Sequence, residues 1–366
     1  MGRGPGGRRA GDWDRVPVAP GEPDFDNLEA VLRRQRPARP TLFEFFLNGP
    51  LYERLAGAYR ADRPREATAD PDLASALLLV DAFAAAGYDY ATVSPPGCRF
   101  PSGAADQLQT RSLNDGALIA DRASLEAYPW PDMEAGGYQL LDQVAAHLPP
   151  GMKLVVPGPM GVLENVIRLV GYDRLCYLIA DDEELAGDLF AGVGSRLVRY
   201  YEHVVRCPAV GAVIGNDDWG YKTQTLLSPE DMRRFVFPWH AAIVRVAHAA
   251  GRPAILHSCG TRHEIWDDII DELQYDGVHS YEDAIQPVED AYEAFGRRLA
   301  ILGGIDVDFV IREAPDRVYG RAAAMLERAA GRGAYGLGTG NSVPAYVPDD
   351  HYFALIRAAH DARAAA

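Results

Sequence analysis

The sequence predicts a (β/α)8 barrel, a single α/β domain with an N-terminal helical extension. The first observation is a series of eight short runs, each apolar on both faces and separated from the next by helical segments. This is the pattern of a parallel sheet covered by helices. The second observation is their number, because eight repeats favour a closed barrel over an open doubly wound sheet. The third is that no Gly-x-Gly-x-x-Gly follows the first run, which removes the main support for a dinucleotide-binding fold.

The expected elements follow one another along residues 27–366, which we interpret as the barrel domain, whereas residues 1–26 are rich in Gly, Pro and Arg and are interpreted as a flexible tail. The runs expected to be strands cover residues 41–46, 90–94, 153–157, 209–215, 254–256, 276–280, 299–304 and 334–338. The expected helices cover residues 27–36, 51–59, 71–87, 137–147, 160–170, 174–206 with an interruption near 181–182, 228–250, 262–273, 288–295, 315–330 and 350–366.

Several helix ends carry recognisable signals. Gly87 and Gly296 stand where a helix is expected to end, as C-capping glycines do. Ser228-Pro-Glu-Asp231 combines an N-cap, a proline at the first helical position and acids in the first turn. Tyr128-Pro-Trp-Pro131 cannot lie inside a helix, so residues 98–135 are expected to be irregular.

Composition restricts the classes of partner. The chain has 366 residues, a formal net charge of -16 and a pI near 5.0, so a nucleic-acid partner is not expected. Its four cysteines form no CxxC pair, which fits a reducing compartment. The basic N-terminus is not followed by an apolar signal segment, and no apolar run is long enough to cross a bilayer. We therefore expect a cytoplasmic protein with no membrane partner and no nucleic-acid partner.

Polar side chains recur where the expected strands end, and in such barrels the chemistry gathers at the carboxyl ends of the strands. The residues concerned are Glu44, Cys98, Asn216, Asp217, Asp218, His279, Glu282, Asp306, Asp308 and Asn341. Lys222 and Arg99 are nearby cations that suit a substrate carboxylate or phosphate, although a solvated cation is the more usual outcome.

These residues also have structural interpretations. A carboxylate inside an apolar run is costly unless it is paired, so Glu44 suits an internal ion pair as well as a site. Asp217 or Asp218 is also explained as the cap of a turn. His279 is also explained as a hydrogen-bonded core histidine. Asp306, after a pair of glycines, is also explained as a residue that stabilises its own turn.

The fifth run ends in His257-Ser-Cys259-Gly260. Period-2 alternation sends the imidazole and the thiol to the same side, where Gly260 lets the backbone turn away. Both groups are zinc ligands, and a zinc site needs a third and usually a fourth ligand. The alternative is a strand end that carries a histidine and a reduced cysteine.

From about Asn27 onwards the chain resembles the uroporphyrinogen decarboxylase-like superfamily, most closely its zinc and corrinoid methyltransferase branch. The segments that carry this resemblance are Leu-His257-Ser-Cys259-Gly260, Asp217-Asp-Trp-Gly220 with Ser228-Pro-Glu, Leu-Gly303-Gly304-Ile-Asp306, and Gly338-Thr-Gly340-Asn341. The resemblance implies a (β/α)8 enzyme in which zinc, held by a His-x-Cys pair and a distant Cys, activates a substrate thiol for methyl transfer from a corrinoid.

Two departures from the superfamily patterns affect this interpretation. Thr339 occupies the position of the distant Cys, so a metal must borrow a ligand from His279, Glu282, Asp217 or Asp306. The decarboxylases proper carry an Arg-Gln-Ala-Gly-Arg segment after the first strand, and here Leu47-Asn-Gly-Pro50 stands there without arginines.

The resulting hypothesis is a metal-dependent methyltransferase that moves a methyl group between a corrinoid or methylated small molecule and a thiol-type acceptor. The expected ligands of a divalent metal, zinc by preference, are His257, Cys259 and His279. The expected catalytic groups are Asp217, Asp306 and Glu282, and the expected substrate contacts are Glu44, Asn216, Asp218, Lys222 and Asn341. Because the corrinoid-binding motif Asp-x-His-x-x-Gly is absent, a corrinoid would arrive free or on a separate protein. The alternatives are decarboxylation of a tetrapyrrole or polycarboxylate, with Asp217 on the pyrrole nitrogens, and a non-enzymatic corrinoid or tetrapyrrole binder.

Overall fold

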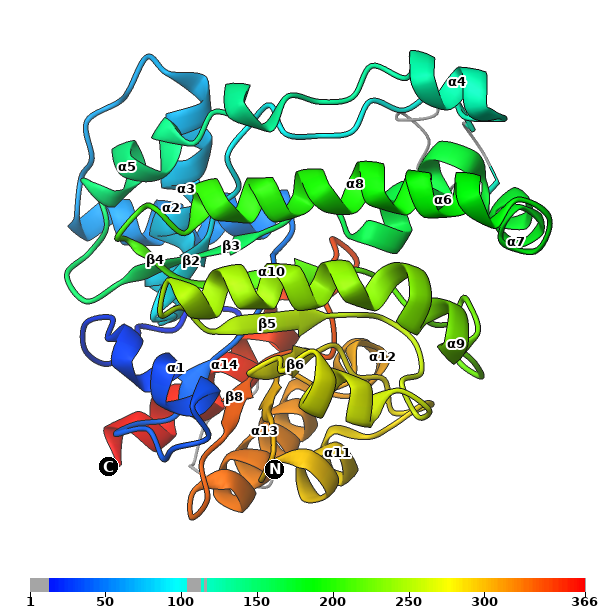
Figure 1. Ribbon diagram of the computed structural model, residues 1–366. Helices are drawn as coiled ribbons and strands as arrows, with labels where there is room; N and C mark the ends of the chain where they lie inside the picture. The colour runs from blue at the N-terminus through cyan, green and yellow to red at the C-terminus, as the bar shows by residue number, and fades with distance from the viewer. Residues whose placement is uncertain (1–12, 104–112, 115–116, 366) are drawn as a thin grey trace. The chain divides into compact units, whose positions relative to one another are not determined.

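The computed structural model describes residues 13–103, 113–114 and 117–365. Its eight strands form one parallel sheet in the order β1-β8-β7-β6-β5-β4-β3-β2, so the predicted (β/α)8 architecture is confirmed (Figure 1). The strands are β1 (Thr41–Leu42), β2 (Tyr90–Thr92), β3 (Lys153–Pro157), β4 (Val210–Asn216), β5 (Ala254–His257), β6 (Gly277–His279), β7 (Ala300–Leu302) and β8 (Tyr335–Leu337). Each lies within a run that the sequence predicted, to within one residue at its ends.

Helices separate the strands, as expected. They are α1 (Phe25–Leu32), α2 (Gly49–Asp62), α3 (Pro71–Ala86), α4 (Arg122–Ala127), α5 (Gln139–Ala145), α6 (Val162–Val170), α7 (Tyr172–Asp181), α8 (Glu183–Val204), α9 (Pro229–Asp231), α10 (Phe237–Ala249), α11 (Val288–Phe295), α12 (Val307–Arg312), α13 (Pro315–Ala329) and α14 (Asp349–Ala364). A short 3-10 turn lies at Met133–Ala135. Of the helices in the described part of the chain, none is both long and apolar enough to cross a membrane.

Two short helices, α4 and α12, were not predicted from the sequence. Both α12 and α4 have six residues, too few to show a 3.6-residue period, and each begins after a capping aspartate, Asp306 or Asp121. The helix expected over residues 262–273 is reduced to a π-helical turn at Asp268–Glu272 and the two residues before it.

The helix expected over residues 228–250 begins as predicted, with the Ser228 side chain accepting a hydrogen bond from the Asp231 backbone N–H. It then passes through a π-helical turn at Met232–Val236 before α10 starts. Pro238, in the first turn of α10, has no N–H to donate to a carbonyl one turn earlier, so the preceding turn widens.

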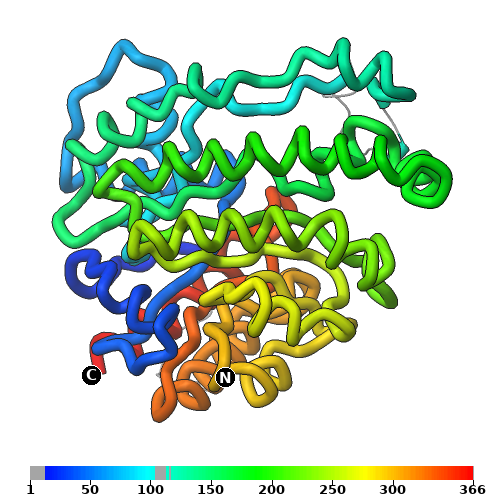
Figure 2. The backbone as a smooth tube through the Cα atoms, in the orientation of Figure 1, coloured from blue at the N-terminus to red at the C-terminus, as the bar shows by residue number. Residues whose placement is uncertain are grey.

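The chain forms two compact units. The first comprises the described residues up to Val93, Asp142–Val155 and the residues from Asp276 onwards, and the second comprises Ser94–Leu141 and Val156–Tyr275. Within the second unit, β4 pairs with β5, and α8 and α10 lie side by side along the outside (Figures 1 and 2). Within the first unit, β8 lies between β1 and β7.

Side-chain hydroxyls connect β1 to β2 within the first unit. The two strands stand at opposite ends of the sheet order. The Tyr90 hydroxyl accepts a hydrogen bond from the Glu44 backbone N–H (2.8 Å) and donates one to the Glu44 carbonyl (2.5 Å). Thr92 Oγ1 donates to the Phe45 carbonyl at 2.9 Å. These hydroxyls satisfy buried backbone groups that a strand ladder would otherwise satisfy.

Residues 1–12 of the predicted tail lie outside the described residues. After them, the Trp13 side chain is buried and its Nε1 donates a hydrogen bond to Asp316 Oδ1 at 3.0 Å. Helix α1 begins at Phe25, two residues before its predicted start. The boundary between a tail and a domain at residues 26–27 stays a prediction.

Candidate functional site

The carboxyl ends of β4 and β5 are held together residue by residue in the second unit. Asn216 is the register neighbour of His257, and the backbone N–H of Asp217 donates to the His257 carbonyl at 2.9 Å. One residue further along, Asp218 Oδ1 accepts a hydrogen bond from the Cys259 backbone N–H at 2.9 Å. Because two adjacent strand ends are locked in this way, their polar side chains converge on one small region.

Three potential metal ligands meet there. The side chains of Asp218, His257 and Cys259 offer oxygen, nitrogen and sulfur atoms that all lie within 4.8 Å of one another. The distance between Cys259 Sγ and His257 Nε2 is 3.9 Å. Tetrahedral zinc, with bonds of about 2.3 Å to sulfur and about 2.0 Å to nitrogen, separates two such ligands by about 3.6 Å. The three residues therefore fit a zinc-type ion with little rearrangement.

The sequence predicted two of these three residues as ligands. It expected His257 and Cys259 to converge, and they do. It assigned Asp218 to the substrate and sought the further ligand elsewhere, at His279 or, failing that, at Glu282, Asp217 or Asp306. Nothing in the sequence distinguishes which of two consecutive aspartates in a loop turns towards a neighbouring strand end, since this depends on the β4–β5 register.

Gly260 shapes the loop that follows Cys259. Its φ is +82°, in the left-handed region, and a Cβ on Gly260 would overlap the Gly220 backbone carbonyl. The close approach is supported by a hydrogen bond from the Thr261 N–H to the Tyr221 carbonyl (2.7 Å). The loops after β4 and β5 therefore pack backbone against backbone.

We expect Gly260→Ala to destabilise the chain by more than about 2 kcal/mol, because a left-handed alanine costs about 1–2 kcal/mol before the overlap is counted. The matched control is Gly187→Ala in α8, where an added Cβ meets nothing within 4 Å. That control should be neutral or stabilising by about 0.5–1 kcal/mol. Urea unfolding followed by circular dichroism measures both, and equal stabilities for the two variants would refute the close-packing argument.

Asp217 holds the start of helix α6. Its side chain is fully buried, and its two oxygens accept hydrogen bonds from the backbone N–H groups of Leu163 and Glu164, both at 2.9 Å. His240 Nε2 donates to the same carboxylate at 2.9 Å, and His240 Nδ1 lies 2.7 Å from the Tyr275 hydroxyl. The sequence allowed a capping role for this residue, and the structure provides one between distant segments. Its catalytic assignment stays a prediction.

Glu164 and His240 belong to this region and were missed by sequence reasoning. Glu164 Oε2 accepts a hydrogen bond from the Gly161 N–H at 3.0 Å. Burial, reinforced by the charges of Asp217 and Asp218, raises the pKa of Glu164 well above its usual range. The spacing Gly161-x-x-Glu164 at a helix start resembles a capping box and was the available signal. His240 had no signal, since it is one histidine in an apolar helix.

Asn216 carries an unsatisfied acceptor beside the three ligands. Its Oδ1 is buried, and within the described part of the chain it has no hydrogen-bond partner. Buried polar atoms are normally paired, so an orphan next to a candidate metal cluster suits a donor supplied by a ligand. The predicted role of Asn216 in substrate binding is therefore retained as a proposal.

Glu44 is fully buried in the first unit, and its partner is Thr339. Its Oε1 accepts a hydrogen bond from the Thr339 N–H (2.6 Å), and its Oε2 lies 2.8 Å from Thr339 Oγ1. Thr339 Oγ1 also lies 2.5 Å from the Asn341 carbonyl, which can only accept. One hydroxyl has one proton, so both contacts are satisfied when Glu44 is protonated and donates to Thr339. Consistently, burial raises the pKa of Glu44 from 4.5 to about 8.

Two other predicted residues of the first unit have structural partners. His279 is fully buried, with its Nε2 3.3 Å from the Thr339 carbonyl, which matches the core-histidine interpretation. Asp306 caps α12 by accepting from the Phe309 N–H at 3.0 Å, and its other oxygen accepts from the Asp283 N–H at 2.7 Å. Their assignments as metal ligand and catalytic group stay predictions.

The remaining predicted contacts lie in loops. Asn341 is half-buried, with its Oδ1 accepting from the Ser342 N–H at 2.7 Å, and Glu282 is half-buried in the turn after β6. Lys222 and Arg99 are exposed in the second unit. Their roles in binding or catalysis also stay predictions.

Comparison with known proteins gives one family match. Residues 142–362, more than half of the chain, match the model of the family described as uroporphyrinogen decarboxylase (URO-D). The matched segment includes both strand ends that carry the three ligands. Among curated proteins, none matches the sequence.

Solved structures share the fold. A methyltransferase from Methanosarcina mazei is similar over 92% of this chain and 97% of its own, with a TM-score of 0.65 and 16% identity. A protein of Listeria monocytogenes described as a candidate vitamin-B12-independent methionine synthase is similar over 88% of this chain and 98% of its own, with a TM-score of 0.45 and 12% identity. An arabinopyranosidase from Geobacillus stearothermophilus is similar over 91% of this chain and 78% of its own, with a TM-score of 0.40 and 11% identity. At 16% identity, the similarity to the Methanosarcina methyltransferase supports the fold alone. The other two structures, with TM-scores of 0.45 and 0.40, support no inference about this chain.

Proposed function

Because the chain belongs to the uroporphyrinogen decarboxylase family, we propose from its ligand cluster that it is a cytoplasmic, metal-dependent methyltransferase. The methyl group would pass between a corrinoid or methylated small molecule and a thiol-type acceptor. The observation that supports this proposal is the convergence of Asp218, His257 and Cys259 at the ends of two neighbouring strands. The fold likeness to a Methanosarcina methyltransferase is compatible with it.

The donor set suits zinc. One thiolate, one imidazole and one carboxylate leave a tetrahedral ion with one open position, which is the arrangement of catalytic zinc sites. In that position zinc would supply Lewis acidity that keeps a substrate thiol deprotonated near neutral pH. Because an oxygen ligand replaces the second sulfur, the site is harder than one with two thiolates and also suits cobalt or iron.

The chain's own residues would orient these groups. The Cys259 backbone N–H donates to Asp218, and the Asp217 N–H donates to the His257 carbonyl, so the two loops hold the three ligands in register. Behind them, His240 and the start of α6 fix the Asp217 carboxylate. Asn216 Oδ1 would accept a hydrogen bond from the substrate. A corrinoid would arrive free or on a separate protein.

The decarboxylase alternative receives less support from the same geometry. It relies on Asp217 to stabilise pyrrole nitrogens, and both oxygens of Asp217 already accept hydrogen bonds inside the protein. The arginines expected after the first strand for porphyrinogen carboxylates are also missing. No separate observation favours a non-enzymatic carrier.

The test is metal content by elemental mass spectrometry after expression with zinc, cobalt, manganese and iron. We expect about one ion per chain in the wild type and a loss of most of it in Cys259→Ser, because a neutral hydroxyl is a poor substitute for a thiolate. Cys176→Ser is the matched control, since that thiol is exposed on α7 and outside the cluster. It should retain the full metal content.

Methyl exchange between methylcobalamin and small thiols then tests the reaction itself. Turnover that is lost together with the metal in Cys259→Ser supports the whole proposal. A metal-free wild type would overturn the metal site. A loaded protein that exchanges no methyl group with any corrinoid or thiol would overturn the assigned reaction and leave the site intact.

A further inference from the structure

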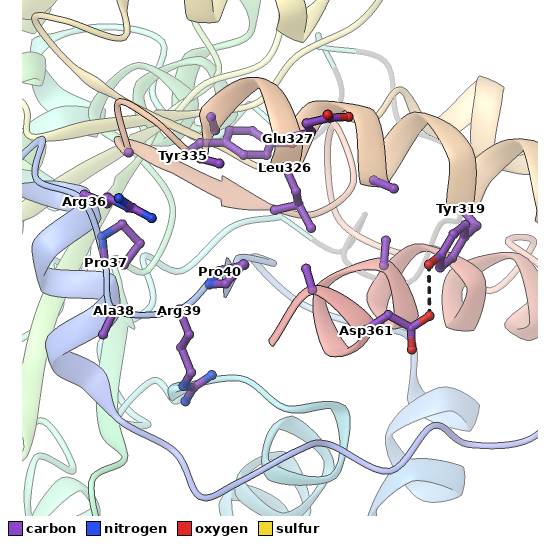
Figure 3. A pocket seen from close by; sticks show the side chains of 16 residues that line it. Arg36, Pro37, Ala38, Arg39, Pro40, Tyr319, Leu326, Glu327, Tyr335 and Asp361 are labelled. Carbon is purple, nitrogen blue, oxygen red and sulfur yellow. Dashed lines mark hydrogen bonds between the residues drawn. The ribbon is translucent and has the colours of Figure 1, made fainter. Parts of the chain in front are cut away.

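A cavity of about 460 Å³ lies in the first unit, away from the carboxyl ends of its strands. Its walls are the segment Arg36–Pro40 that leads into β1, the residues that begin β8, and helices α13 and α14 (Figure 3). Small-molecule sites have volumes of about 300–1,000 Å³, so this cavity is large enough for a ligand. Chemistry in (β/α)8 enzymes takes place at the opposite ends of the strands.

Most of the lining is apolar and small. Six alanines, two prolines and Leu326 contribute most of the surface between α13, α14 and the segment before β1. Alanines on facing helices leave space that larger side chains would fill. Tyr335 adds an aromatic wall, and its own hydroxyl is directed elsewhere, to the Gly303 carbonyl at 2.9 Å. The body of a ligand here would therefore be a hydrocarbon chain or ring.

Two guanidinium groups belong to residues that line the cavity. Within the described part of the chain, no acceptor bonds to the exposed Arg36. Arg39 pairs through Nη2 with Asp89 at 2.5 Å, but its Nη1 is buried without a partner in the described residues. Figure 3 places Arg36 at one end of the cavity and Tyr319 with Asp361 at the other. A ligand with one anionic group at this end of the cavity would form a charge-assisted hydrogen bond with Arg36.

The acidic lining residues do not cancel this preference. Asp361 Oδ2 already accepts a hydrogen bond from the Tyr319 hydroxyl at 2.9 Å. Glu327 is exposed, so its carboxylate remains hydrated. We propose that this cavity binds a small apolar molecule that carries a single carboxylate, such as a medium-chain fatty acid or an aryl carboxylate.

Strands β1 and β8 connect this cavity to the buried Glu44. The cavity wall leads directly into β1 and β8, and the other ends of these two strands carry Glu44 and Thr339, which are hydrogen-bonded to each other. A ligand that stiffens the starts of both strands would stabilise the segment that keeps this pair together. The cavity shares no residue with the cluster of Asp218, His257 and Cys259, so ligand binding here does not depend on the proposed reaction.

The test is isothermal titration of the full-length protein with octanoate and with its neutral analogue octanamide. We expect one octanoate per chain and binding weaker by about tenfold or more in Ala323→Trp, which places an indole in the cavity. Ala324→Trp is the matched control, because Ala324 is the next residue of α13, exposed and outside the lining. Arg36→Gln should weaken octanoate by several-fold, and Arg36→Lys should restore part of the loss.

Other outcomes overturn the proposal. Equal affinity for octanoate and octanamide would remove the role of the charge. Octanoate binding unchanged in Ala323→Trp would move the ligand away from this cavity. If the wild type binds no octanoate, and sedimentation shows self-association that Ala323→Trp abolishes and Ala324→Trp does not, a second copy of the chain covers the cavity instead.

Discussion

The wild-type chain is expected to lose up to about 5 kcal/mol of stability as the pH rises from 4.5 to about 8, and Glu44→Gln is expected to abolish this loss. Burial raises the pKa of Glu44 from 4.5 to about 8, and each pKa unit corresponds to about 1.4 kcal/mol. A glutamine reproduces the hydrogen bonds of the neutral acid. Its oxygen accepts from the Thr339 N–H, and its amide donates to Thr339 Oγ1.

The direction in which the free energy of unfolding changes with pH follows from proton binding to Glu44 in the folded and unfolded chain. Below pH 4.5 both the folded and the unfolded chain hold the Glu44 proton, so this group adds no pH dependence. Between pH 4.5 and about 8 the folded chain keeps the proton and the unfolded chain releases it, so the free energy of unfolding falls as the pH rises. Above pH 8 both states are ionised and the loss is complete.

The measurement is urea unfolding of wild type and Glu44→Gln from pH 4.5 to 9. The difference in free energy of unfolding between them should grow by about 1.4 kcal/mol per pH unit up to about pH 8 and then level off. Glu53→Gln, at an exposed position of α2, is the matched control and should leave the pH profile unchanged. Parallel profiles for wild type and Glu44→Gln would show that the carboxyl is ionised in the folded chain.

Asp217→Ala is expected to destabilise the chain by about 3–5 kcal/mol, because it leaves three buried hydrogen-bond donors without an acceptor, at about 1–3 kcal/mol each. The substitution would leave His240 Nε2 and the Leu163 and Glu164 N–H groups without their acceptor. It should also weaken metal binding by about 10–100-fold, because Asp217 anchors the loop that carries Asp218. Urea unfolding and competition with a zinc chelator measure the two effects separately.

The control is Asp182→Ala, which removes the N-cap of α8 and its hydrogen bond from the Leu185 N–H. At this exposed position the loss should be about 1 kcal/mol, with no change in metal affinity. If both variants lose the same stability, Asp217 acts only as an ordinary cap. If Asp217→Ala keeps the wild-type metal affinity, the loop does not depend on this anchor.

The (β/α)8 architecture and one pair of candidate ligands could be predicted from the sequence alone. Eight runs apolar on both faces are found where buried parallel strands lie, because such strands have no solvent-facing side to mark with polar residues. The convergence of His257 and Cys259 also required only local information, since alternate residues of one strand share a side. Short elements such as α12 escaped because six residues cover fewer than two helical turns, which is too short to show a repeating pattern.

The neighbours of His257 and Cys259, in contrast, depend on the tertiary structure. The register between β4 and β5 turned Asp218 towards Cys259 and left Asp217 beneath the start of α6, and consecutive aspartates carry no sign of this division. Glu44 and Thr339 are 295 residues apart in the sequence, so neither the raised pKa of Glu44 nor its hydrogen-bond partner can be predicted from the residues around it. Hydrogen-bond partners and burial are set by contacts between distant segments, and these fix the protonation and the role of each polar side chain.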